Sequence, residues 1–204
     1  MEQLNLFAEN TEDFNTIKIQ NGEYIYVANY FSKENSDLYF NALLDKIDWK
    51  QESMNMYGKT INFPRLTAWY GDNDKPYTFS GITLSPKKWT ESLLDIKQQI
   101  EPKAQANFNS VLLNLYRNGE DSISWHTDAE KELGLNPVIA SVNFGATRKF
   151  QLRHMNTNEK IELILTHGSL LVMKGELQHF WQHQVPKTKQ AVKERINLTF
   201  RVIK

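Results

Sequence analysis

A histidine and an aspartate stand two positions apart in the segment Trp125-His126-Thr127-Asp128. If this segment is a strand, both side chains project from one face, because side chains alternate with a period of two. The imidazole and the carboxylate could then share a metal cation, and His183 is the best candidate for a third ligand. Two histidines and a carboxylate on one face of a metal, with the opposite positions open, are typical of non-haem Fe(II) sites.

The C-terminal segment predicts an anion site. Polar residues alternate there with apolar ones: Arg195, Asn197, Thr199 and Arg201. Planar guanidinium groups suit bidentate binding of carboxylates, so this face favours a dicarboxylate ligand. Asn114 and Tyr116 share a face of an earlier strand and could donate to the same carboxylate. A strand with one solvated face is the alternative.

Helices precede strands along the chain. Ser32 is a candidate N-cap for a helix that runs to about Trp49, and Ser85-Pro86 is expected to open a second helix. A short strand is expected at 24–27, before the first helix. After the helices, a period of two or short apolar runs predict strands at 111–117, 138–144, 149–153, 161–166, 170–173 and 196–202. Early helices followed by many short strands predict an α+β domain with a sandwich or jelly-roll core.

Composition limits the class of protein. A chain of 204 residues fits a single domain, expected over 21–204 after a flexible tail at 1–20. The absence of cysteine excludes disulfides and thiolate metal sites. Long apolar runs and an export signal are missing, so we expect a cytoplasmic protein, associated with the nucleoid if bacterial. The formal net charge is zero, so nucleic-acid binding would depend on local basic patches.

The N-terminal tail contains one apolar island, Gln3-Leu4-Asn5-Leu6-Phe7. It looks like the Gln-Leu-x-Leu-Phe motif with which bacterial proteins bind the replication sliding clamp, and Gln3, Leu4, Leu6 and Phe7 would be the contacting residues. A loose tail without a partner is the other interpretation.

The residues that could do chemistry, taken together, resemble the AlkB family of Fe(II)/2-oxoglutarate dioxygenases. The matching motifs are His126-x-Asp128, His183 and Arg195-x-Asn197-x-Thr199-x-Arg201. Further segments at 76–81, 84–86, 114–116, 121–123, 140–145 and 167–173 match as well. The resemblance extends from about residue 50 to 203 and is greatest to the branch that repairs duplex DNA in the human nucleus. It implies a jelly roll supported by two N-terminal helices, with a hairpin lid over the substrate.

The resemblance also implies cofactors and their ligands. His126, Asp128 and His183 would hold Fe(II) as the catalytic centre. The co-substrate 2-oxoglutarate would chelate the iron, with O2 at the remaining position. Its far carboxylate would meet Arg195, Asn114 and Tyr116, and its near end would meet Arg201 with Asn197, on the face that also carries Thr199.

The implied activity is removal of N-methyl groups from flipped-out DNA bases such as 1-methyladenine and 3-methylcytosine, with release of formaldehyde. The resemblance and the local composition give these candidate substrate residues: Tyr57, Arg65, Tyr77, Phe79, Ser80 and Glu130. Phe79 and the His126 ring would form the walls around the base. Glu130 would meet its exocyclic amine, with a solvated loop charge as the alternative. Tyr57 would fill the gap in the duplex, with ordinary packing under a loop as the alternative. This chain departs from duplex-repair relatives at Ala129, where they carry a second acid.

Other functions remain open at this point. An Fe(II)/2-oxoglutarate oxygenase that acts on RNA or protein would need the same metal and co-substrate residues. A non-catalytic nucleic-acid-binding module built on a jelly roll is the alternative from another class. We expect a monomer with DNA as its main partner and no association with membranes.

Overall fold

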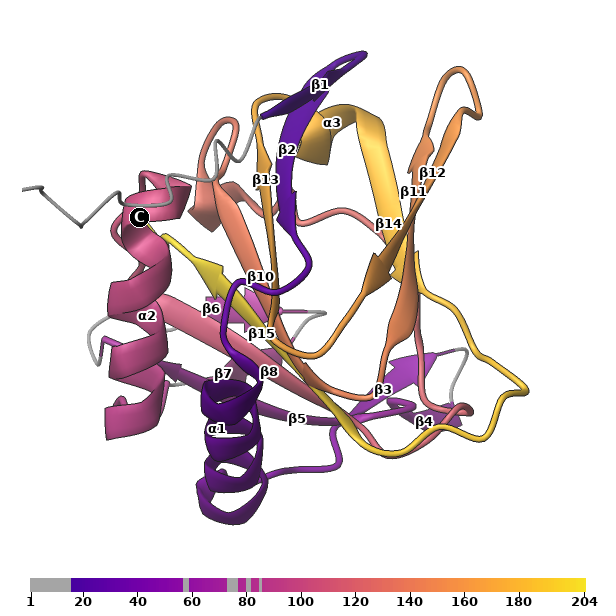
Figure 1. Ribbon diagram of the computed structural model, residues 1–204. Coiled ribbons are helices and arrows are strands. Elements are labelled where there is room, and N and C mark those ends of the chain that lie inside the picture. The colour runs from indigo at the N-terminus through magenta and orange to yellow at the C-terminus, as the bar shows by residue number, and fades with distance from the viewer. Residues whose placement is uncertain (1–15, 57–58, 73–76, 80–81, 85) are drawn as a thin grey trace, which may run out of the picture.

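The computed structural model describes residues 16–56, 59–72, 77–79, 82–84 and 86–204, with the backbone alone described at 55–56, 77–79 and 82–84 (Figure 1). Two antiparallel sheets face each other, and the two long helices lie on the outer side of the larger sheet (Figure 1). This arrangement agrees with the predicted α+β jelly roll.

The larger sheet has the strand order β1-β2-β13-β10-β15-β8-β5, with every neighbouring pair antiparallel. Its strands are β1 (Ile17–Ile19), β2 (Gly22–Val27), β5 (Leu66–Gly71), β8 (Ser110–Tyr116), β10 (Ile139–Gly145), β13 (Ser169–Lys174) and β15 (Arg195–Arg201). The strand β15 lies between β10 and β8, so one strand at the centre of the sheet carries both predicted arginines.

The smaller sheet has the order β12-β11-β14-β9. Its strands are β9 (Ile123–His126), β11 (Arg148–His154), β12 (Lys160–Leu165) and β14 (Trp181–Val185). Two separate hairpins complete the strands: β3 (Ser53–Met56) with β4 (Lys59–Asn62), and β6 (Tyr77–Phe79) with β7 (Ile82–Leu84). The strand β9 is an edge strand, so one of its sides is open to a ligand.

The helices are α1 (Lys33–Lys46), α2 (Glu91–Ala104), the short α3 (Leu177–Phe180) and the 3-10 turn η1 (Lys131–Leu133). Ser32 caps α1 as predicted, because its hydroxyl accepts from the backbone N–H of Asn35. The predicted start of the second helix at Ser85-Pro86 was wrong. Lys87 instead forms backbone hydrogen bonds of 3.0 Å with Trp69 and Gly71 on β5, which keeps the chain extended there. Thr90 then caps α2.

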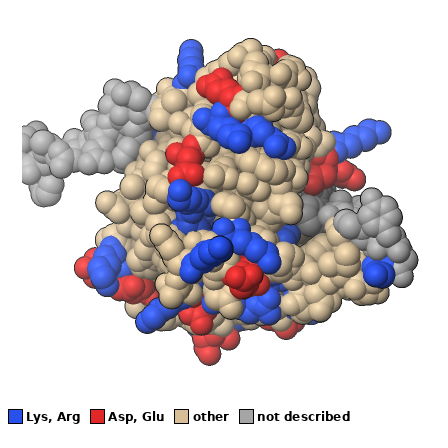
Figure 2. Space-filling model, turned by 90° about the vertical axis from the view of Figure 1, so that its right-hand side faces the viewer, with Lys and Arg blue, Asp and Glu red and all other residues tan. Residues whose placement is uncertain are grey.

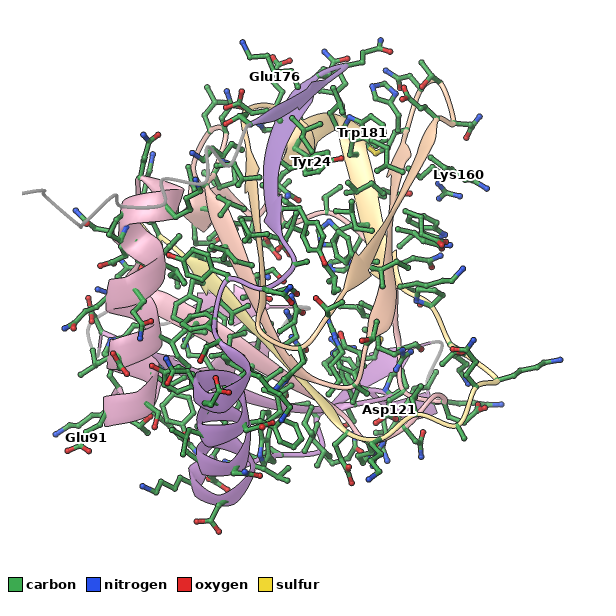
Figure 3. All side chains as sticks on the ribbon, viewed as in Figure 1. Tyr24, Glu91, Asp121, Lys160, Glu176 and Trp181 are labelled. Atoms are coloured by element: carbon green, nitrogen blue, oxygen red, sulfur yellow. The ribbon has the colours of Figure 1, made fainter. Side chains whose placement is uncertain are left out.

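Two apolar layers hold these elements together. Leu93, Ile96 and Ile100 on α2 are fully buried against the outer face of the larger sheet. The second layer lies between the sheets and includes Tyr24 on β2 and Trp181 on β14, which Figure 3 labels near α3. Since both faces of the larger sheet are covered, its central strands are buried along their whole length.

Two further expectations need correction. The folded region begins earlier than residue 21, because β1 pairs Ile17 with Tyr24 of β2. The strand that carries His126 ends at that residue, so Asp128 lies beyond it and does not follow the strand period. No helix within the described ranges is both long and apolar enough to cross a lipid bilayer.

Candidate metal centre and co-substrate cavity

The three predicted metal ligands meet at one end of the cavity between the sheets. His126 on β9 and His183 on β14 are register partners, and their ring centroids lie 4.2 Å apart. The Oδ1 atom of Asp128 lies 3.9 Å from Nε2 of His126. One potential ligand atom from each residue lies within 4.8 Å of the others, which is close enough for a single cation.

Hydrogen bonding defines the tautomer of His126. Its Nδ1 lies 2.8 Å from the carbonyl oxygen of Ser124. A carbonyl can only accept, so Nδ1 carries the proton and Nε2 is left with a lone pair for a metal. The ring of His183 stacks on Phe150 at a centroid distance of 5.4 Å, which restrains its orientation.

The protonation states suit a cation. Burial, together with the nearby His126, lowers the pKa of His183 to about 3, so this imidazole is neutral near pH 7. Burial alone would raise the pKa of Asp128, but the charge of Arg201 and its hydrogen bond to the carboxylate hold this pKa well below its ordinary value. Neutral imidazoles and an ionised carboxylate are the forms that bind metals.

Two atoms of this set show that a cation fits. Asp128 Oδ1 and His183 Nδ1 are buried and have no hydrogen-bond partner among the described residues. Leaving a carboxylate oxygen buried without a partner is unfavourable, and a bound cation would satisfy it. The donor set of two imidazoles and one carboxylate is that of a facial Fe(II) site.

Asp128 is held from two sides. Its Oδ2 accepts a 2.8 Å hydrogen bond from Nη2 of Arg201 on β15, and both side chains are buried. Its backbone N–H donates to Oε1 of Gln178 on α3 at 2.9 Å. These contacts replace the sheet hydrogen bonds that Asp128 lacks, because it lies beyond the end of β9.

The opposite end of the cavity is formed by Arg195. This residue is 1% exposed, its Nη2 donates to Oδ1 of Asn143 at 2.5 Å, and its guanidinium lies over the Tyr116 ring at 4.9 Å. Burial lowers its pKa to about 10, which still leaves it charged at neutral pH. Among the described residues, Nε and Nη1 of Arg195 have no hydrogen-bond acceptor. A buried cation with free donors fits a carboxylate ligand.

A polar network lies between the two ends. Asn197 donates to the hydroxyl of Ser141 at 2.8 Å, and its own carbonyl accepts from Thr199 at 3.1 Å. Asn114 approaches the same carbonyl at 3.5 Å. The predicted residues Asn114, Tyr116, Asn197 and Thr199 therefore line one cavity together with Arg195, Arg201 and the three metal ligands.

Arg65, predicted on the substrate side, is buried behind this cavity. Its Nε donates to Oδ1 of Asn114 at 2.7 Å, and its guanidinium lies 5.2 Å from the ring centroid of Phe63. Burial lowers its pKa. Arg65 thus orients a residue of the co-substrate cavity and at the same time lines a second cavity.

That second cavity is a cleft of about 380 Å³ along the free edge of β9. Its walls come from the hairpin β3–β4 and the chain after it on one side and from residues 122–127 with Glu130 on the other. Of the three candidate metal ligands, His126 alone lines this cleft, and it lines the first cavity as well, so the two cavities meet at this residue. Oε2 of Glu130 is buried without a hydrogen-bond partner in the part of the chain that the structure describes.

Several predicted residues fall outside the description. Tyr57, Ser80 and the N-terminal residues Gln3, Leu4, Leu6 and Phe7 are not among the described residues. Tyr77 and Phe79 belong to β6, of which the backbone alone is described. Their predicted roles stay predictions.

Sequence reasoning missed some residues that shape the site. Asn143 orients Arg195, and Gln178 holds the backbone of Asp128. Asn143 could have been found, because Ser141 and Asn143 are polar residues at strand spacing within an apolar run. Gln178 gives no comparable signal, since its partner is 50 residues away.

Comparisons with known proteins agree with this geometry. The model of the 2OG-Fe(II) oxygenase superfamily matches residues 23–201. The alpha-ketoglutarate-dependent dioxygenase alkB homolog 3 of Bos taurus is 44% identical over 178 residues, covering 82% of this chain and 62% of that protein. The chain therefore spans less than two thirds of the length of that relative.

Two more proteins are similar. The human DNA oxidative demethylase ALKBH2 is 39% identical over 184 residues, covering 85% of this chain and 70% of that protein. The solved structure of OsALKBH1 superposes with a TM-score of 0.63 at 17% identity, covering 91% of this chain and all of the other. At this identity the likeness shows the fold alone, and it confirms the predicted jelly roll.

Replacing Asp128 with alanine should weaken metal binding more than about 100-fold, since loss of an outer partner of a ligand already costs 10–100-fold. Anaerobic calorimetric titration with Fe(II) would measure this. Asp37→Ala is the matched control, because Asp37 also pairs with a histidine, His167, at 3.2 Å but belongs to no group of three candidate ligands among the described residues. Equal affinity of Asp128→Ala and wild type would contradict the assignment.

Replacing Arg195 with lysine should raise the KM for 2-oxoglutarate at least about tenfold, because an ammonium cannot reproduce the bidentate contact and a charged hydrogen bond contributes 1.5–3 kcal/mol. Steady-state release of succinate measures the effect. Arg117→Lys serves as control, since this half-exposed arginine pairs with Asp121 instead. An unchanged KM in Arg195→Lys would remove this residue from the co-substrate site.

Proposed function

The chain belongs to the 2OG-Fe(II) oxygenase superfamily, and we propose that it repairs alkylated DNA by oxidising N-methyl groups on flipped-out bases. Members of this family use Fe(II), 2-oxoglutarate and O2, in agreement with the cofactors expected from the sequence. One observation carries the proposal: His126 is one of the three candidate metal ligands and also lines the cleft.

Different residues of the chain would hold the iron and the 2-oxoglutarate. His126, Asp128 and His183 would hold the iron, and Arg195 would hold the far carboxylate of 2-oxoglutarate. When bound, these groups supply, with O2, the oxidising power that side chains lack. Arg201 keeps the carboxylate of Asp128 ionised and oriented, and Gln178 fixes its backbone. The burial of both partners excludes water from this ion pair.

The cleft is the place for the substrate base. A methyl group on a Watson–Crick nitrogen is inaccessible within a stacked duplex, so the base must leave the stack. His126 would form one wall beside it. Glu130 would accept from the exocyclic amine, and its unpaired Oε2 favours a cationic base such as 1-methyladenine or 3-methylcytosine. Hydroxylation of the methyl carbon gives a hemiaminal, whose C–N bond breaks to release formaldehyde while the ring nitrogen keeps the electron pair.

DNA as the substrate class is supported by the relatives rather than by the metal site. The human relative carries the name DNA oxidative demethylase. Tyr57, Tyr77, Phe79 and Ser80 belong to this proposal as further substrate contacts. Figure 2 shows Lys and Arg in the middle of the face that carries β11 and β12, with Asp and Glu among them. Lys149 on β11 pairs with Glu162, and Lys187 after β14 pairs with Glu120, so any phosphate contacts of these lysines would have to compete with these ion pairs.

The test is a single-turnover reaction. The protein is loaded anaerobically with Fe(II) and 2-oxoglutarate and then mixed with O2 and an oligonucleotide that contains 1-methyladenine. We expect stoichiometric succinate, formaldehyde and repaired adenine, with Asp128→Ala inactive. Turnover with methylated RNA or peptide but not with DNA would assign another substrate. Failure to form any succinate would contradict the enzyme and favour a binding module.

The proposal includes a monomer in the cytoplasm that reaches DNA through the sliding clamp. The support for the clamp is the pentapeptide at residues 3–7 alone. A pull-down with purified clamp should lose the protein when Leu6 and Phe7 are both replaced by alanine. Asn5→Ala is the matched control, because Asn5 occupies the variable position of the motif. Equal retention of the double variant would end this part of the proposal.

A further inference from the structure

Trp125 is an aromatic residue of the cleft that the metal site does not use. It precedes His126 on β9, and neighbouring side chains of a strand point to opposite faces. His126 points to the metal set, so Trp125 lies on the outer face of the smaller sheet. Because β9 is an edge strand, the cleft runs along its free side and is lined by both residues.

An arginine holds this indole in place. The guanidinium carbon of Arg153 on β11 lies 4.4 Å from the centroid of the Trp125 ring, which is a cation–π contact. Arg153 is itself fixed by a 2.8 Å hydrogen bond from Nη2 to Oε1 of Gln182, its register partner on β14. One face of the indole is therefore covered, and the ring is ordered before any ligand arrives.

Trp125 also lines the cleft. Met54, Ile61 and Phe63 line the same cleft from the hairpin β3–β4 and the chain after it. The result is an opening with an ordered aromatic ring beside the residue that binds metal. Proteins bind unpaired nucleic acid by stacking its bases on aromatic side chains, whatever the base sequence. Arginines near such side chains contact the phosphate backbone of the nucleic acid.

We propose that Trp125, backed by Arg153, is a stacking platform for an unpaired nucleobase next to the base that reacts. This inference rests on the proposed function and deepens it, because it specifies the state of the substrate. A neighbouring base that remains paired in a duplex cannot leave its stack to lie on an indole without an added cost. The platform therefore favours single-stranded over duplex substrates.

The test uses variants that separate stacking from packing. Trp125→Leu keeps an apolar side chain but has no π face, whereas Trp125→Phe retains stacking. We expect Trp125→Leu to raise the KM for a single-stranded methylated oligonucleotide at least about fivefold, because this variant loses the stacking of a base on an aromatic side chain. Trp125→Phe should recover most of the loss. The KM for 2-oxoglutarate in uncoupled turnover should not change in either variant.

Substrates with abasic neighbours make the test specific. When the nucleotides on both sides of the lesion lack bases, wild type and Trp125→Leu should have the same KM, because there is nothing to stack. The same KM comparison on an RNA strand of matched sequence shows whether the unpaired base on the platform belongs to DNA or to RNA. Equal KM values of wild type and Trp125→Leu on the normal single strand would overturn the platform, as would a difference that persists on the abasic strand.

The two proposals fail in different ways. If wild type repairs no methylated oligonucleotide, the proposed function fails before the platform is tested. If wild type repairs single strands and the two variants are indistinguishable from it, the platform alone fails. A loss of uncoupled 2-oxoglutarate turnover in Trp125→Leu and in Trp125→Phe alike would show that the indole only stabilises β9, and this also overturns the platform.

Discussion

The buried ion pair between Asp128 and Arg201 joins the two halves of the site. Arg201 belongs to β15 in the larger sheet, whereas Asp128 follows β9 of the smaller sheet. A buried pair gains little net stability, because desolvation offsets the attraction, but its geometry is strict. Here that geometry sets the distance between the sheet that supplies both histidines and the sheet that supplies both arginines.

The strand β15 places the polar side chains of the site within the buried part of the protein. One side of β15 carries Arg195, Asn197, Thr199 and Arg201, and the other carries residues of the core beneath the helices. Both sides are buried, so the polar side must satisfy its groups internally. Ser141 and Asn143 on β10 do so in part. Among the described residues, the exceptions include donors of Arg195 and Oδ1 of Asp128, which lie where a dicarboxylate and a cation are expected.

Much of this was predictable from local patterns. The alternation of polar and apolar residues from Arg195 to Arg201 identified the polar face of this strand correctly. Such an alternation can be recognised from consecutive residues of the sequence alone. The helix start at Ser85-Pro86 failed, because pairing of Lys87 with β5 overrides the local signal for a helix. Asp128 was assigned to the right site for the wrong reason, since tertiary contacts with Arg201 and Gln178 rather than a strand period place it. Contacts between residues that are far apart in the chain produce no periodic pattern in the sequence.

His126 and Arg65 connect the co-substrate cavity to the cleft. His126 lines both, and Arg65 lines the cleft while its Nε orients Asn114 on the co-substrate side. Nδ2 of Asn114 in turn lies 3.5 Å from the side-chain carbonyl of Asn197. Arg65 is 4% exposed and packed on Phe63, so it can shift only if this wall of the cleft shifts with it. A short series of polar contacts thus links the residues of the two cavities.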